Sequence, residues 1–240
     1  MIMSNFALAL LNKIALLFPA FLCVFTFRGF FQAFIALIMG DKTARQDGYM
    51  SLNPLIHVDI FGVSITMAIF FVLGLAFEGI IPYGMLLLLL LALGIRWTYP
   101  IPIEETNFKR YRLGGILTAF SGSIGSLFLA FIFLCIMRLL SLFTLPEYAF
   151  LSITKLLSAT VDLAIWFCVL DLIPLPPFDG GRALRYIIPY SKQYIVDWLE
   201  EYSFYIMIAL FFLPGVSNIF WAILYALQFI IEKALISIVF

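Results

Sequence analysis

The sequence has little charge, a single histidine and only three cysteines. Charged residues make up 12% of the 240 positions, whereas 64% are hydrophobic. A water-soluble globular protein needs more polar residues to cover its surface, so this composition excludes that class. Basic and acidic residues balance at 14 each, so the net positive charge typical of nucleic-acid-binding proteins is also absent. The cysteines all lie in apolar stretches, where we expect buried side chains rather than disulfides.

Long apolar runs are what the sequence has in abundance. They predict an all-α, polytopic transmembrane helical bundle with about five to seven spans of roughly 20 residues each. We expect residues 1–240 to form one integral membrane domain. After an apolar lead-in at 1–12, its spans are expected at 13–39, 62–81, 85–95, 113–142 and 151–173, followed by a hydrophobic region at 203–240. Pro214 and Gly215 interrupt that region, which predicts either two half-spans or one kinked span.

The basic residues of the predicted loops are distributed unevenly. Nine of them lie in three segments that the predicted spans place on one side of the membrane, at 40–60, 96–112 and 174–202. Only Arg138 and Lys155 lie on the other side. Loops rich in lysine and arginine remain in the cytoplasm, so we expect the loop-rich side to be cytoplasmic.

Arg28 and Gln32 are polar residues inside an otherwise apolar predicted span. Their spacing of four residues places them on one helix face. Gly40, which lacks a Cβ and so suits the end of a helix, follows Arg28 after 12 residues, or roughly 18 Å at 1.5 Å per residue. An arginine at that depth in the membrane is costly unless a partner or a cavity receives it.

A second polar group follows the predicted span at 151–173. The stretch 171–182 reads DLIPLPPFDGGR, and its prolines and glycines are expected to break the helix. Broken backbone at membrane depth is tolerated only where protein or a water-filled cavity surrounds it. Asp179 within this break is therefore a candidate metal ligand or ion-pair partner.

Four sequence blocks follow one another along the chain. They are GDKTA at 40–44, SLNPL and HVD at 51–55 and 57–59, WTYPIPI at 97–103 with Asn107-Phe108, and DLIPLPPFDGGR at 171–182. Together they resemble the site-2 protease family of intramembrane zinc metalloproteases, in its compact bacterial form. The resemblance covers roughly residues 20–190. It implies that family's membrane fold, its proteolysis of transmembrane segments, and a location in the bacterial inner (cell) membrane.

The sequence departs from this family at its metal site. The family motif H-E-x-x-H falls on Arg28, Gly29 and Gln32, so both histidine ligands and the general-base glutamate are replaced. Of the ligand positions only Asp179 is retained, and Asp171 stands where the later motif has asparagine. A hydrolytic zinc site needs about three protein ligands, an open coordination position and a base. The resemblance therefore implies a degenerate member, a pseudoprotease with no cofactor.

Several residues near the lost site are expected to line a cavity. They are Asn53, Pro54, His57, Asp171, Pro174, Pro176, Gly180 and Gly181. We expect an ion pair between Arg28 and Asp179; the alternatives for Arg28 are a pair with Asp171, a backbone carbonyl, or a side chain that extends to the interface. The resemblance implies that the Asn53 loop and the P-x-P segment hold an extended substrate strand, which requires no metal.

Three functions are compatible with these observations. The first is a pseudoprotease that binds or regulates transmembrane segments of other proteins, with membrane lipid around it and no nucleic acid as a partner. The second is an active metalloendopeptidase, whose zinc would be held by Asp179, His57 and a further carboxylate such as Asp41 or Asp171. The third is a small transporter or channel, suggested by buried charges and broken helices. Three of the predicted spans contain too few polar residues to line its path.

Overall fold

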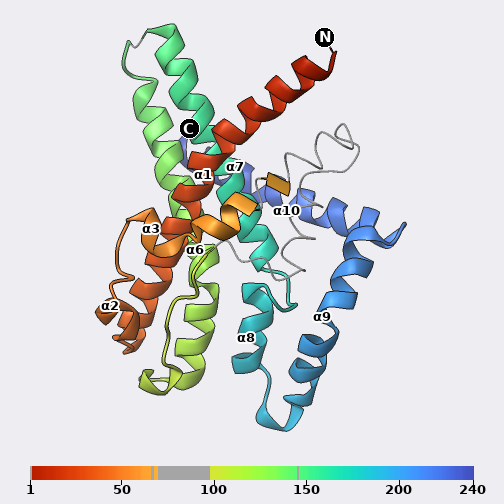
Figure 1. Cartoon of the computed structure of the whole chain (residues 1–240). Coiled ribbons are helices and arrows are strands. Elements are labelled where there is room, and N and C mark those ends of the chain that lie inside the picture. The colour runs from red at the N-terminus through yellow and green to blue at the C-terminus, as the bar shows by residue number, and fades with distance from the viewer. Residues whose placement is uncertain (1, 66–67, 70–97, 145) are drawn as a thin grey trace.

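The computed structural model describes residues 2–65, 68–69, 98–144 and 146–240 (Figure 1). Within these residues the regular structure is helical, apart from an isolated β-bridge between Val58 and Thr98. The helices are α1 (Ile2–Met39), α2 (Thr43–Gln46), α3 (Pro54–His57), α6 (Tyr111–Leu140), α7 (Glu147–Asp171), α8 (Asp179–Ile187), α9 (Tyr194–Phe212) and α10 (Val216–Val239), with 3₁₀ turns η1 (Glu105–Asn107) and η2 (Tyr190–Lys192). The all-α prediction is confirmed for this part of the chain.

Four helices among the described residues are long and apolar enough to cross a membrane. They are Ala15–Met39 within α1, and the whole of α6, α7 and α10. Each has between 24 and 30 residues, more than the roughly 20 that a bilayer requires. These helices agree with the predicted integral membrane protein. Most of the predicted spans 62–81 and 85–95 lies outside the described residues, so the count of five to seven remains a prediction.

The first helix is longer than the predicted span. The sequence predicts a lead-in at 1–12, whereas α1 is continuous from Ile2 to Met39. The reason is that no glycine or proline occurs before Pro19, and proline is tolerated inside a membrane helix. The helix ends where Gly40 takes a φ of +117°, a left-handed conformation that favours glycine, as predicted.

The C-terminal region differs from both predicted arrangements. The break at Pro214 and Gly215 separates two complete helices rather than two half-spans. Helix α9 begins at Tyr194, inside the predicted loop segment 174–202, and of the two helices only α10 is both long and apolar enough to cross a membrane. Gly215 has a φ of +88°, which residues with a side chain disfavour, and this fixes the position of the break.

Helix α6 packs against α1, α7 and α8 and forms the centre of the bundle (Figure 1). Small residues allow its close approach to α1: a Cβ on Gly125 would lie 2.8 Å from the Cβ of Phe31. Between α1 and α7, the rings of Phe25 and Phe167 meet edge to face with centroids 4.6 Å apart. This packing directs one face of α1, including Arg28, toward α6 and α7.

The loop after α1 is held by the buried carboxylate of Asp41. This carboxylate accepts hydrogen bonds from the Thr43 hydroxyl at 2.6 Å, the Asn107 amide at 3.0 Å and the Glu104 N–H at 2.9 Å. Burial alone would raise the pKa of Asp41, but the hydrogen bonds outweigh it and hold the pKa below its ordinary value. Asp41 thereby fastens the segment after Thr98 to the end of α1.

Candidate functional site

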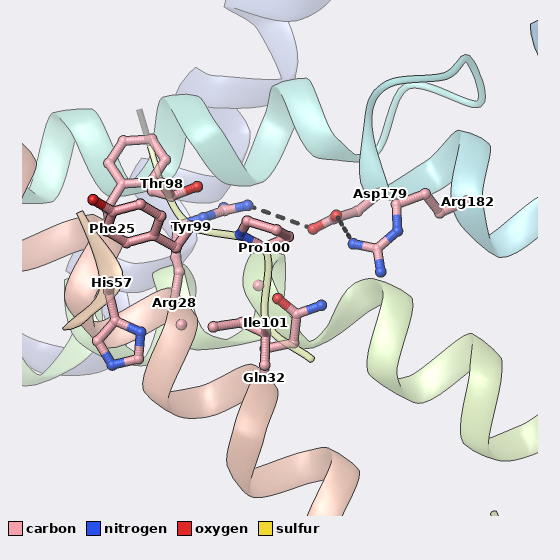
Figure 2. Close-up of a pocket in the computed structure, with 12 residues that line it drawn as sticks. Phe25, Arg28, Gln32, His57, Thr98, Tyr99, Pro100, Ile101, Asp179 and Arg182 are labelled. Carbon is pink, nitrogen blue, oxygen red and sulfur yellow. Dashed lines mark hydrogen bonds and ion pairs between the residues drawn. The ribbon is translucent and has the colours of Figure 1, made fainter. Parts of the chain in front are cut away.

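A cavity of about 230 Å³ lies between α1, α3, α6, α8 and the segment 98–101 (Figure 2). It is lined by Phe25, Arg28, Gly29, Gln32, His57, Thr98, Tyr99, Pro100, Ile101, Gly122, Asp179 and Arg182. The three positions that the resemblance assigns to the H-E-x-x-H motif, Arg28, Gly29 and Gln32, therefore face one space together with His57 and Asp179. The other predicted lining residues do not line it: Asn53, Pro54, Asp171, Pro174, Pro176, Gly180 and Gly181.

Arg28 reaches from α1 to two carboxylates. Its Nη1 pairs with Asp171 Oδ2 at the end of α7, and its Nη2 lies 3.4 Å from Asp179 Oδ2 at the start of α8. Nη1 also donates to Ser126 Oγ of α6 at 3.0 Å. The three charged side chains are only 11% to 13% exposed, so each depends on the others for charge compensation. The guanidinium joins four helices and pairs with both carboxylates at once.

The space around this guanidinium depends on a glycine of α6. A Cβ on Gly122 would lie 2.9 Å from Arg28 Nη2 and 2.9 Å from Asp179 Oδ2, so a larger residue would displace the ion pair. The ring centroids of Phe25 and Phe167 both lie 5.8 Å from the guanidinium carbon, within the range of a cation–π contact. Gly122 is absent from the predicted site, although its place among small residues is a signal of close helix contact.

His57 fills the space that a side chain at position 29 would need. A Cβ on Gly29 would lie 2.9 Å from both Cε1 and Cγ of His57, and closer still to Nδ1. The imidazole is buried, and its Nε2 lies 2.7 Å from the carbonyl oxygen of Ser51. Because a carbonyl only accepts, Nε2 carries the proton and Nδ1 is an acceptor. Among the described residues Nδ1 has no hydrogen-bond partner.

The His57 ring is neutral at pH 7. Burial lowers its pKa, and the hydrogen bond to the Ser51 carbonyl opposes this effect only in part. The Nδ1 atom lies close to the position that a Cβ on Gly29 would occupy. A glutamate in place of Gly29, as in the H-E-x-x-H motif, would require the His57 ring to move.

Arg182 and Gln32 complete the polar wall of the cavity. Figure 2 shows Arg182 and Arg28 on opposite sides of the Asp179 carboxylate, and Arg182 Nη1 lies 3.4 Å from Asp179 Oδ1. The Arg182 side chain is half exposed, so it lies at the mouth of the cavity. The Gln32 amide has no hydrogen-bond partner in the described part of the chain.

Gly180 and Gly181 shape the turn between α7 and α8 rather than the cavity wall. A Cβ on Gly180 would lie 2.8 Å from the Leu172 carbonyl oxygen, and one on Gly181 would lie 2.7 Å from Pro176 Cδ. Only glycine lets this turn, which also contains Pro174, fold back onto α8. These residues position Asp179 from behind.

Asn53 and Pro54 determine the start of α3. The Asn53 side chain accepts a hydrogen bond from the Leu55 N–H at 3.1 Å, and Pro54 occupies the first turn. Both are typical helix N-terminal residues. Their contribution to the site is therefore to orient the helix that ends with His57.

The segment 98–101 lines the cavity in an extended conformation. Thr98 forms the bridge to Val58, and the Tyr99 N–H donates to the His57 carbonyl at 2.9 Å. Ile101 lies between two prolines, and its N–H has no partner among the described residues. This segment is absent from the predicted site residues. Its alternation of prolines with larger residues is the signal that identifies an extended segment.

The side chains at the cavity do not fit a zinc ion. Zinc binds histidine, cysteine and carboxylate ligands in tetrahedral sets. The carboxylates of Asp171 and Asp179 both pair with Arg28, whose guanidinium has no lone pair to donate. In the described part of the chain, no three His, Cys, Asp or Glu side chains form a group that could hold a metal ion. The alternative zinc site of His57 and Asp179 with Asp41 or Asp171 is therefore not among such groups.

The chain is similar to a protein of Bacillus subtilis (strain 168) that is named "Putative zinc metalloprotease YwhC". The two are 29% identical over 204 residues, which cover 84% of this chain and 82% of that protein. No protein-family model matches the chain, and no solved structure matches it. The similarity extends over most of both chains and supports a metalloprotease-like family for this membrane protein.

Proposed function

We propose that this chain is a pseudoprotease of the site-2 protease type, which has lost zinc-dependent cleavage and binds transmembrane segments of other membrane proteins. The observation that supports this most is the Arg28 guanidinium between Asp171 and Asp179. A positive charge from the chain itself compensates the carboxylates that a metal would otherwise have to compensate. The site is thus complete without a metal.

The position of the general base supports the same proposal. Gly29 has no group that accepts a proton from water, and the ring of His57 fills the space that a Cβ at this position would need. The similarity to a protein named as a zinc metalloprotease supports the family, and the replaced ligand positions support the loss of zinc-dependent cleavage.

The proposed binding role rests on the segment 98–101 and on Gln32. The Ile101 N–H, between Pro100 and Pro102, has no hydrogen-bond partner among the described residues. A partner segment that unwinds at the cavity can hydrogen-bond to this edge by strand addition, and the Gln32 amide can add a further contact. Neither contact requires a metal.

Metal content and cleavage test the proposed loss of catalysis. The purified full-length protein is expected to hold far less than one zinc per chain by mass spectrometry and to leave single-span peptides intact. The triple variant Arg28→His, Gly29→Glu, Gln32→His restores the motif, but His57 obstructs it. Adding His57→Ala and Asp171→Asn is expected to increase the zinc content. Stoichiometric zinc with cleavage by the unaltered chain would overturn the proposal.

Photocrosslinking tests the proposed binding role. A photoreactive residue in place of Gln32 is expected to crosslink a single-span peptide that contains helix-breaking residues. The same residue in place of Leu139, which is 56% exposed on α6, serves as the control. Ile101→Pro removes the N–H and is expected to reduce crosslinking several-fold. Equal crosslinking from positions 32 and 139 would contradict binding in the cavity.

A further inference from the structure

Helix α9 has a buried face and an exposed face. Val196, Met207 and Phe211 are buried. The opposite side of the helix carries six residues spaced three or four apart, which we name the aromatic–acidic face: Tyr194, Asp197, Trp198, Glu201, Tyr202 and Tyr205. Its four rings are 40% to 67% exposed. In Figure 1, α9 lies at the edge of the molecule beside α8.

The aromatic–acidic face is poorly suited to lipid. Helix α9 is not among the helices that are long and apolar enough to cross a membrane. Tyr194 and Tyr205 are about 16 Å apart along the axis at 1.5 Å per residue, whereas each headgroup layer is about 5 to 8 Å thick. Only a helix that lies flat would place all four rings in that layer. It would then bring Asp197 and Glu201 against a membrane surface that is itself negative.

One flank of α9 already binds a guanidinium of this chain. Arg185 of α8 donates from Nε to Glu200 Oε1 at 2.9 Å, and its Nη2 pairs with Glu200 Oε2. The same Nη2 lies 3.8 Å from Asp197 Oδ1. Carboxylates of α9 are thus placed to bind arginine, and they do so at its border with α8.

The rest of the aromatic–acidic face has no such partner within the described residues. Among the residues that the structure describes, Glu201 forms no ion pair and no cation lies over any of the four rings. Glu201 follows Trp198 by three residues and precedes Tyr205 by four, so a carboxylate lies between two aromatic rings on the helix surface. Aromatic faces attract lysine and arginine, and an adjacent carboxylate strengthens that attraction.

We propose that the aromatic–acidic face of α9 binds a basic segment of another protein, through cation–π contacts to its rings and ion pairs with Glu201 and Asp197. The identity of that segment rests on the proposed function: it is the basic juxtamembrane flank of the protein whose span enters the cavity. Membrane proteins carry lysine and arginine next to their spans on the cytoplasmic side. One partner would then contact the cavity with its span and α9 with its flank.

A soluble basic peptide tests this interaction in the full-length protein. The probe is a labelled peptide of alternating arginine and glycine, measured by fluorescence anisotropy against protein in nanodiscs of zwitterionic lipid. A peptide with glutamine in place of arginine is the control probe. The variant Trp198→Ser, Glu201→Gln is expected to bind the arginine peptide about 5- to 20-fold more weakly. The control variant Tyr148→Ser, Glu147→Gln alters an exposed tyrosine and an exposed acid of α7 and is expected to bind it normally.

The other outcomes overturn the proposal. Equal binding of the glutamine peptide, or an equal loss in the Tyr148→Ser, Glu147→Gln control, would show that no specific basic-segment site exists on α9. Strong quenching of Trp198 fluorescence by brominated lipid, taken as the difference between wild type and Trp198→Phe, would assign the face to the membrane.

The peptide has no span, so its binding does not depend on the cavity. Peptide binding without crosslinking at Gln32 would refute the proposed function and retain the α9 interaction. Crosslinking at Gln32 without peptide binding would refute only the α9 interaction.

Discussion

Arg28 and Arg185 are each held by two carboxylates, in surroundings that differ sharply. The Arg28 side chain is 13% exposed, and its partners come from α7 and α8. The Arg185 side chain is 49% exposed, and both of its partners come from α9. A buried charge depends on its partners because water cannot replace them, whereas water and salt weaken an exposed pair. Similar contacts therefore stabilise the helix bundle at Arg28, whereas at Arg185 they lie on an open surface.

Arg28→Met is expected to have the largest effect. It leaves Asp171 buried without a cation and Asp179 with only the half-exposed Arg182, and the loss of a buried partner costs about 3 to 5 kcal/mol in comparable pairs. Thermal unfolding of the purified protein in detergent measures the loss.

A compensated variant sharpens the same prediction. Adding Asp171→Asn and Asp179→Asn to Arg28→Met removes all three charges, so most of the stability is expected to return. Full stability of Arg28→Met alone would show that the ion pairs contribute little and would remove the contrast with Arg185.

Asp41→Asn tests how much a buried carboxylate stabilises the fold when its partners are neutral hydrogen-bond donors and not a cation. At pH 7 the variant is expected to lose about 1 to 3 kcal/mol, because the amide cannot accept all of the same hydrogen bonds. The folded-state pKa of Asp41 is lowered, so its stabilisation is fully present above the unfolded pKa of about 3.9 and is lost as the pH falls through the folded pKa. The difference between wild type and variant should therefore shrink below about pH 4.

Unfolding temperatures measured between pH 7 and pH 3 give this comparison. Asp47→Asn, an exposed acid in the same loop, is the control and is expected to match wild type throughout. A stability gap that grows toward acid would contradict the assignment.

Arg185→Gln is expected to have the smallest effect. Its ion pairs are half exposed, so the loss of unfolding free energy should be about 0 to 1 kcal/mol and should vanish at high salt. Unfolding at low and high ionic strength measures it. A loss as large as that of Arg28→Met would mean that the α8–α9 contact is part of the stable core.

Several features of the fold could be predicted because they depend on composition or on residues close in sequence. The excess of apolar residues predicts membrane helices. Gly40 predicts the end of α1, and the prolines at 174–177 predict the break before Asp179. The starts of α1 and α9 differ from the prediction, because neither start has a strong local sequence signal.

The cavity shows the limit of this reasoning. Arg28, Gly29, Gln32, His57 and Asp179 line it, and all were identified through the sequence motifs. The segment 98–101 lies in one of the four sequence blocks but was not predicted to line the cavity, and neither was Gly122, because each reaches the cavity only through contacts with residues distant in the chain. A single sequence contains no direct record of such contacts.

The sequence by itself predicted an all-α chain with membrane-length helices, and its resemblance to a zinc protease family predicted that an arginine and a glycine stand at the motif positions. Only the tertiary structure decided how those residues are accommodated. Arg28 pairs with two carboxylates that lie more than 140 residues away, and His57 fills the space beside Gly29. The physical reason is that the composition of a helix determines whether it lies in lipid or in water. The partner of a buried charge instead depends on which helices pack together.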